Sequence, residues 1–272
     1  MIRNALKSIV ERFPRTAQFY RNNRDLLDRN SSAIETPWGF SLAGHPAMAS
    51  GTFEPEETRL VRGLLQEVDI LVNVGTNVGY YCCHALSLGK PVTAVEPIAR
   101  NLHYLMRNIT ENGWAQQAEI FPVALGAKAD VLKMWGGGTG ASLIKGWAGI
   151  PESYVTQVPV LTLDRILGSS LQGRQALILV DVEGAEYAVL QGATNSLRHE
   201  PRPIWIVEIG STIHQPSGVT VNPNLVATFE QFFERGYSAV SADAKKAVVN
   251  LETVLAAANG EASFETHNFL FR

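Results

Sequence analysis

The sequence predicts an α/β fold of the Rossmann-like, doubly wound type, built on a mostly parallel sheet. Three observations predict it. Short apolar runs alternate with longer helical stretches, a glycine turn directly follows the first core strand, and an acidic residue ends the next strand. Strands and helices that alternate in this way imply parallel strands joined by right-handed crossovers.

Each element is predicted from its apolar pattern, since short apolar runs between turn residues indicate buried strands and longer stretches with helical spacing indicate helices. The predicted strands are 70–74, 92–96, 119–124, 176–182, 204–209, 237–241 and 268–271. The predicted helices are 53–65, 78–88, 98–112, 163–167, 187–197 and 225–235. A glycine-rich stretch, 136–149, interrupts the alternation between strand-like segments at 131–135 and 158–161. A long loop of this composition suits a lid over a site.

Composition and charge exclude several classes of protein. The 272 residues are 46% hydrophobic and carry a formal net charge of −3. A nucleic-acid-binding protein would need a basic face, and a transmembrane helix would need about 20 consecutive apolar residues; neither is present. The two cysteines, Cys82 and Cys83, are adjacent, which favours buried thiols in a reducing compartment over a framework disulfide. A cytoplasmic protein is therefore expected.

The first 35 residues are predicted to form a helical extension to a single domain that covers residues 36–272. Apolar residues recur there at helical spacing among basic ones: Ile2, Leu6, Ile9, Val10 and Phe13. Such a helix packs on the main domain or on a second subunit, or it lies at an anionic lipid surface. A homo-oligomer and a peripheral membrane contact through this helix both stay open.

The most informative segment is 71–79, in which a buried strand runs into a glycine turn and a helix begins at once. In open α/β sheets, ligands bind outside the carboxyl ends of the strands. Gly75 is expected to turn the backbone sharply without placing a side chain in the ligand's way, and Gly79 to bring the first helical turn close to the ligand. Asn73 and Asn77 belong to the same predicted contact set.

The second strand ends on Glu96, about 20 residues beyond the glycine turn. A doubly wound fold places at this point the acid that accepts hydrogen bonds from ribose hydroxyls. Pro97 follows and suits the first turn of a helix, because proline has no N–H to leave unpaired there. The pattern therefore predicts an adenosine-containing cofactor.

The spacing of the turn favours S-adenosyl-L-methionine over a nicotinamide dinucleotide. A dinucleotide needs the pattern G-x-G-x-x-G so that the backbone approaches the pyrophosphate, and here Asn77 stands in place of the second glycine. S-adenosylmethionine has no phosphate and does not require that approach.

With these residues, the chain resembles the FkbM family of class I methyltransferases. The turn at 73–79 resembles the family's D-v-G-A-N-x-G, and residues 94–97 match its x-x-E-P. Further matches are 122–126, which follow the third strand, and 161–164, which match T-L-D. Residues 181–186 with 189–193 match D-x-E-G-A-E…v-L-x-G-A, and the resemblance covers residues 37–272.

The resemblance implies a seven-stranded sheet with an antiparallel last strand and transfer of a methyl group to an oxygen of a sugar, a polysaccharide or a natural product. It also implies cofactor contacts at Ala124, Ser142 and Asp181. Two positions depart from the family pattern. Asn73 replaces an acid, which keeps hydrogen bonding but loses the charge, and Leu179 replaces a lysine.

Catalysis of methyl transfer requires alignment of the acceptor oxygen with the methyl carbon and removal of the hydroxyl proton. The predicted catalytic residues are Asp181, Glu183 and Glu208, which follow the fourth and fifth strands. His214 and His45 are further candidates. No metal ligands are predicted, because the acids are dispersed and no H-x-x-x-H pattern occurs.

The sequence thus predicts a methyltransferase that uses S-adenosylmethionine and acts on a hydroxyl-bearing acceptor, a sugar, glycan or natural product. Two alternatives remain: a non-catalytic relative that only binds the cofactor, motivated by Asn73 and Leu179, and a nicotinamide-dependent oxidoreductase.

Overall fold

The structure of the chain, a computed structural model, describes residues 31–272. The helix predicted within the first 30 residues, with its subunit or lipid contacts, lies outside the described residues. No helix of residues 31–272 is long and apolar enough to cross a membrane.

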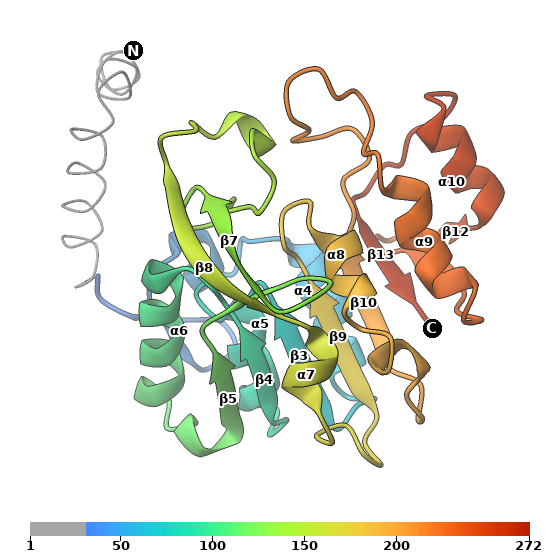
Figure 1. Ribbon diagram of the computed structural model, residues 1–272. Coiled ribbons are helices and arrows are strands. Elements are labelled where there is room, and N and C mark those ends of the chain that lie inside the picture. Colours follow the sequence, from blue (N-terminus) through green and yellow to red (C-terminus); the bar gives the residue numbers. More distant parts are fainter. Residues whose placement is uncertain (1–30) are drawn as a thin grey trace.

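The central sheet has eight strands, and five of them form a parallel core (Figure 1). Its order across the sheet is β12 (Val248–Val249), β11 (Ala239–Ser241), β13 (Asn268–Phe271), β10 (Ile204–Glu208), β9 (Ala176–Val180), β3 (Ile70–Val74), β4 (Val92–Val95) and β5 (Ala118–Phe121). Strands β10 to β5 are parallel, while β13 runs antiparallel to both β10 and β11. The predicted mostly parallel sheet with an antiparallel last strand is confirmed.

The sheet contains one strand more than the seven that the resemblance implies. The additional strand is β12, whose two residues pair with β11 at the sheet edge. A pairing of two residues leaves no periodic signal in the sequence, so the prediction missed it.

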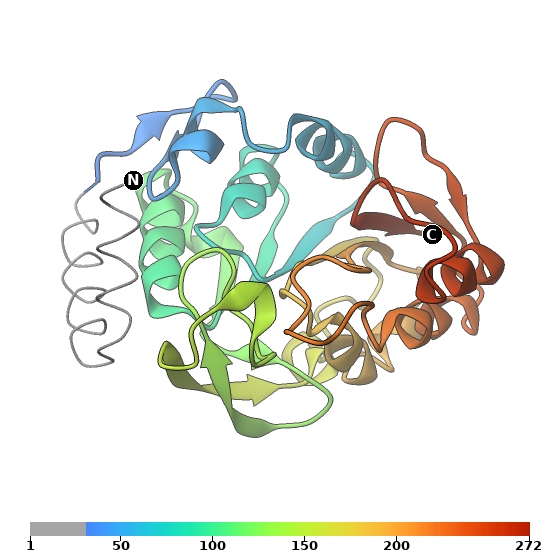
Figure 2. The ribbon, with the colours of Figure 1, turned by 90° about the horizontal axis from the view of Figure 1, so that it is seen from above.

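Helices cover both faces of the sheet, which explains why β3 and β9 are buried at every position (Figure 2). One face packs against α3 (Pro46–Ser50), α4 (Pro55–Leu64), α5 (Tyr80–Ser87) and α6 (Ala99–Glu111). The other packs against α7 (Leu163–Leu167), α8 (Glu186–Gln191), α9 (Leu225–Phe233) and α10 (Leu251–Ala258). Helices α3 and α10 were not predicted. Cys82 and Cys83 on α5 are buried free thiols, as predicted.

The third predicted strand, 119–124, is wrong in its second half. The chain leaves the central sheet after β5, and Ala124 belongs to β6 (Ala124–Leu125). This short strand pairs with β8 (Val155–Leu161), which also pairs with β7 (Asp130–Trp135), in a separate three-stranded sheet. Pro122 lies at the break and has no N–H to donate to a continuing ladder. A short hairpin, β1 (Ile34–Glu35) with β2 (Ser41–Leu42), precedes the domain core.

Several of the family-like motifs fix the backbone. In T-L-D, Thr162 caps α7, and the Asp164 carboxylate accepts N–H groups of Asn195 and Ser196 at 2.8 and 2.9 Å. A Cβ atom on Gly192 would lie 2.2 Å from the carbonyl oxygen of Gly126, so two motif glycines are in backbone contact. These motifs therefore act through packing around the central sheet.

The glycine turn after β3 is set by contacts between strands. Gly75 has a φ of 82°, and a Cβ atom there would lie 1.7 Å from the backbone oxygen of Asp181. Gly79 has a φ of 88°, and its Cβ would lie 2.5 Å from Leu105 on α6. Protein packing therefore favours glycine at both positions, independently of the ligand contacts predicted for them.

We predict that Gly75→Ala destabilises the protein by at least about 2 kcal/mol, because the new methyl group overlaps the Asp181 backbone in addition to straining φ. The control is Gly113→Ala, which has a similar φ of 78° but no atom within 4 Å of its Cβ. Urea unfolding of the two variants measures the difference. Equal losses of stability would mean that the backbone contact is unimportant.

Candidate active site

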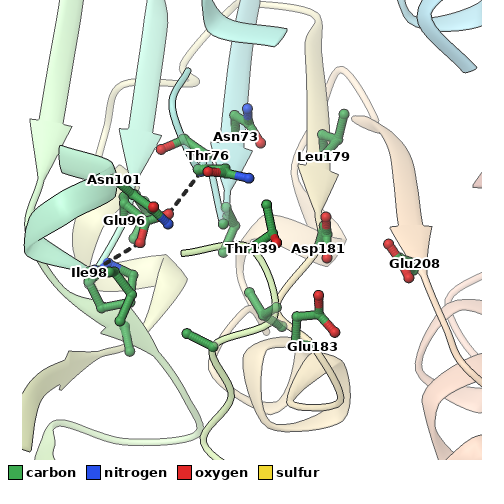
Figure 3. Close-up of a pocket in the computed structure, with 18 of the residues that line it drawn as sticks. Asn73, Thr76, Glu96, Ile98, Asn101, Thr139, Leu179, Asp181, Glu183 and Glu208 are labelled. Atoms are coloured by element: carbon green, nitrogen blue, oxygen red, sulfur yellow. Dashed lines mark hydrogen bonds between the residues drawn. The ribbon is translucent and has the colours of Figure 1, made fainter. Parts of the chain in front are cut away.

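A cavity of about 340 Å³ opens at the carboxyl ends of β3, β4, β9 and β10 (Figure 3). Residues predicted from distant parts of the sequence share its wall. On the side of β3 and β4 lie the predicted cofactor contacts Asn73, Gly75, Asn77, Glu96, Pro97 and Ala124. On the side of β9 and β10 lie the predicted catalytic acids Asp181, Glu183 and Glu208. The two other candidates, His45 and His214, also line the cavity.

Two predicted cofactor contacts, Gly79 and Ser142, are not among the residues that line the cavity. Gly79 begins α5 and packs on Leu105. Ser142 is fully buried, and its hydroxyl donates to the Glu183 carbonyl oxygen at 2.5 Å and accepts the Ile144 N–H at 2.9 Å. The Ser142 hydroxyl therefore links the glycine-rich loop to the segment after β9 by a hydrogen bond.

Glu96 is held by the backbone of two elements. Its side chain is 3% exposed, and its two carboxylate oxygens accept the N–H groups of Asn77 and Ile98, both at 2.8 Å. Burial raises the pKa of Glu96 to about 7, although these hydrogen bonds oppose the shift. One carboxylate therefore ties the glycine turn to the start of α6 and keeps lone pairs for a ligand.

Asn77 explains how this turn works without a second glycine. It adopts a left-handed conformation with a φ of 52°, which asparagine tolerates better than most residues. The same conformation directs its N–H to Glu96.

Three buried polar atoms on the cavity wall have no hydrogen-bond partner in the described structure: Asn73 Oδ1, Thr76 Oγ1 and Asn101 Oδ1. Their side chains are only 2–3% exposed. Buried polar groups in folded proteins are nearly always hydrogen-bonded, so each of these atoms lacks a partner that a ligand can supply. The Asn101 Nδ2 group donates to the Gly138 carbonyl oxygen at 3.0 Å, which leaves its Oδ1 facing the cavity wall without a partner.

The β9 and β10 side of the cavity concentrates acidic groups. Burial and the neighbouring carboxylates raise the pKa of Asp181 well above its ordinary value, with Glu208 the strongest neighbour. Burial, followed by repulsion from Glu183, raises the pKa of Glu208 to about 8. Both acids therefore hold protons more tightly than exposed carboxyl groups do.

Glu54, at the start of α4, also lines the cavity, and sequence reasoning missed it. Its carboxylate accepts the Tyr81 hydroxyl at 3.4 Å. Just beyond it, Glu57 has its pKa raised to about 8 by burial and by the charge of Glu54. Nothing in the local pattern separates Glu54 from the other acids of this helix start, because its position depends on how α4 packs.

The glycine-rich loop is attached to Glu183. The Trp147 indole N–H donates to Glu183 Oε2 at 2.7 Å, and a Cβ atom on Gly184 would lie 2.5 Å from the Trp147 ring. His214 Nδ1 lies 3.8 Å from the same carboxylate oxygen. Gly184 of the D-x-E-G-A-E motif is therefore needed to seat the tryptophan of this loop.

Left-handed backbone conformations gather around the cavity. Six described residues other than glycine have a positive φ, and four of them line it: Glu54, Asn77, Glu183 and His214. Such conformations are costly and concentrate at functional sites.

Glu186 and His45 have different surroundings. Glu186 begins α8, its carboxylate accepts the Gly184 N–H at 2.9 Å, and it does not line the cavity. Burial lowers the pKa of His45, whose Nδ1 accepts the Met48 N–H and caps α3. Across residues 31–272, no group of three or more His, Cys, Asp or Glu side chains is arranged to hold a metal ion.

Comparisons with solved structures returned methyltransferases. The FkbM methyltransferase from Methylobacillus flagellatus KT is 16% identical, with a TM-score of 0.45, over 75% of this chain and 43% of that one. An O-methyltransferase from Bacillus cereus, solved in complex with SAH, is 14% identical, with a TM-score of 0.42, over 82% and 83% of the two chains. This chain thus spans less than half the length of the Methylobacillus protein. A search of curated proteins returned no match.

The family assignment comes from the sequence profile of the Methyltransferase FkbM domain, which matches residues 73–239. The matched segment runs from the last part of β3 to the start of β11 and includes Glu96, Asp181, Glu183 and Glu208. The chain belongs to the FkbM methyltransferase family.

Proposed function

We propose that the protein transfers a methyl group from S-adenosyl-L-methionine to a hydroxyl of a sugar, a glycan or a natural product. The observation that carries the proposal is Glu96, a buried carboxylate at the end of β4 whose two oxygens are fixed by backbone N–H groups. A fixed pair of acceptors at this point of a doubly wound sheet suits the two hydroxyls of a ribose.

The donor set of the cavity fits the proposed cofactor. Asn73 Oδ1 and Asn101 Oδ1 are unpartnered acceptors, and the cofactor carries an ammonium group and an adenine amino group as donors. Asn73 supplies a neutral acceptor where the family pattern has an acid, so an ammonium group bound there gains a hydrogen bond but no ion pair.

When bound, S-adenosylmethionine supplies an activated methyl group, so the protein mainly has to orient the acceptor and remove its proton. Asp181 and Glu208 suit the second task, because their raised pKa values make them better bases than exposed carboxylates. Glu183 suits acceptor binding, since Trp147 already fixes one of its oxygens. Hydroxyl groups donate readily to carboxylates, which supports an alcohol as the acceptor.

We predict that S-adenosylhomocysteine stabilises the protein against thermal unfolding, by about 2.7 kcal/mol at a concentration 100 times its Kd. Glu96→Ala should weaken binding by roughly 1.5–3 kcal/mol, because it removes charge-assisted hydrogen bonds. Thermal unfolding with and without S-adenosylhomocysteine measures the stabilisation, and titration calorimetry measures the change in affinity.

Glu119→Ala is the control for this experiment, because Glu119 is an exposed acid on β5 outside the cavity. The control should bind with wild-type affinity. Unchanged affinity of Glu96→Ala would exclude the ribose contact, and no thermal shift at millimolar S-adenosylhomocysteine would exclude the cofactor.

A second prediction concerns the Glu208 carboxyl group. In the folded protein it keeps its proton up to a pH of about 8, whereas in the unfolded chain it loses the proton at its ordinary, lower pKa. The free energy of unfolding therefore falls as pH rises between about 5 and 8. Glu208→Gln should remove up to about 1.4 kcal/mol per pH unit from this slope.

Urea unfolding at pH 5, 6, 7 and 8 measures the slope, with Glu119→Gln as the exposed control. If Glu208→Gln and the control give the same slope as wild type, the carboxyl group titrates normally and is a poor base near neutral pH.

A further inference from the structure

Residues 136–141, which we call the glycine flap, form the tip of a hairpin at the wall of the cavity. Four of the six residues are glycines, so the flap has few side chains that could hold its backbone by packing. At the base of the flap, Trp135 and Ser142 exchange two backbone hydrogen bonds of 2.8 and 2.9 Å. Three flap residues line the cavity: Gly138, Thr139 and Ala141. The position of the flap therefore determines the shape of the cavity.

Asn101 of α6 joins the flap to the cofactor side of the cavity, and Figure 3 shows it next to Glu96, the proposed ribose contact. The Asn101 Nδ2 group donates to the Gly138 carbonyl oxygen at 3.0 Å. A carbonyl oxygen only accepts, so this bond fixes the direction of the amide and turns Oδ1 away from Gly138. Asn101 is 2% exposed, and its Oδ1 has no partner among the described residues. One amide therefore holds the flap with its donor end and offers a buried acceptor at the other.

The same loop is joined to the acceptor side of the cavity through Glu183. Just after the flap, the Ser142 hydroxyl donates to the Glu183 carbonyl oxygen at 2.5 Å. Five residues further on, the Trp147 indole N–H donates to the Glu183 carboxylate at 2.7 Å, and the Trp147 side chain is only 4% exposed. The loop 136–149 therefore connects Asn101 on one side of the cavity to Glu183 on the other.

We propose that Asn101 is a positioning residue that couples cofactor binding to closure of the glycine flap, and that the closed flap orients Glu183 for the acceptor. The proposal rests on the proposed function, in which a donor of S-adenosylmethionine, such as its adenine amino group, reaches Asn101 Oδ1. A donor at Oδ1 fixes the amide from both ends and so stabilises the hydrogen bond to Gly138. A ligand that binds more tightly to the closed flap than to the open one shifts the population toward the closed state.

The coupling sets an order for the reaction. Because Ser142 and Trp147 follow the flap in the same loop, closure fixes the backbone and the carboxylate of Glu183 together. Coupling between two sites is reciprocal, so closure of the flap also raises the affinity for the cofactor. The acceptor site is therefore complete only with the cofactor bound, and the acceptor binds second.

Hydrogen–deuterium exchange of the full chain, with and without saturating S-adenosylhomocysteine, tests the coupling. The N–H groups of Ser142 and Ala148 donate to the carbonyl oxygens of Trp135 and His214, so their exchange reports opening of the loop. We expect the ligand to slow exchange in segment 136–149 at least about fivefold. Binding measured by calorimetry without such slowing overturns the coupling and leaves the methyltransferase function intact. Absence of binding counts against the proposed function, and the coupling falls with it.

Asn101→Asp separates the coupling from simple coverage of the loop by the ligand. The new carboxylate keeps acceptor oxygens for the cofactor but has no N–H for Gly138. At saturating S-adenosylhomocysteine, exchange of residues 75–79 should still slow, whereas segment 136–149 should exchange as fast as it does without the ligand. Slowing of this segment as in wild type would show that Asn101 does not transmit binding.

Two further variants complete this experiment. Asn101→Ala removes both ends of the amide, should give the same loss of slowing, and keeps the test valid if the carboxylate impairs folding. Asn259→Asp is the matched control, because Asn259 is an exposed asparagine at the end of α10, outside the cavity. The control should show the wild-type slowing of segment 136–149.

Trp147→Phe tests the link from the flap to the acceptor side. Phenylalanine keeps a ring against Gly184 but has no N–H for Glu183. S-adenosylhomocysteine should still slow exchange in the flap. The yield of labelled product from methyl-tritiated S-adenosylmethionine and an extract of the native host should fall at least about fivefold relative to wild type, because Glu183 is no longer oriented. A wild-type yield would show that closure of the flap does not set Glu183.

Discussion

The close approach of the turn after β3 to the end of β9 is the constraint on which the site depends. The Asp181 N–H donates to the Val74 carbonyl oxygen at 3.0 Å, and the Asp181 carbonyl oxygen occupies the space where a side chain at Gly75 would lie. The backbone of β3 therefore meets the backbone of β9 where both strands end. This contact places the acid of the fourth strand beside the turn that carries the proposed cofactor contacts.

The sequence predicts well those parts of the fold in which the polarity of each residue matches its burial. Strand β9 is apolar throughout, and β3 is apolar at every position except Asn73, because both faces of the sheet are covered. The position of Glu96 followed from the same local rules. The two-residue strands β6 and β12 carry no such signal, because each exists only through its pairing with another strand. β6 pairs with Val160 and Leu161 of β8, and β12 pairs with Ala239 and Val240 of β11.

The predicted site residues that do not line the cavity have structural contacts instead. Gly79 packs on Leu105, and the Ser142 hydroxyl donates to the Glu183 carbonyl oxygen, so their cofactor contacts stay predictions. Glu54 was missed because its place at the cavity depends on tertiary packing. Sequence reasoning thus finds motifs, whereas the division of a motif into ligand contacts and structural contacts needs the fold. Asn77 and Glu183, which both have a positive φ, line the cavity and also make hydrogen bonds within the protein. Ligand-facing and structural contacts therefore occur in the same turns.

Strand β13 has a consequence for how the chain folds during synthesis. It is the last described strand in the sequence, yet it lies inside the sheet, where it pairs with β10 on one side and β11 on the other. Until residues 268–271 leave the ribosome, two apolar strand edges remain unpaired. Unpaired edges of this kind recruit other chains, so a product truncated before β13 exposes a surface prone to aggregation and a target for chaperones. Completion of the sheet therefore has to wait until β13 has been synthesised.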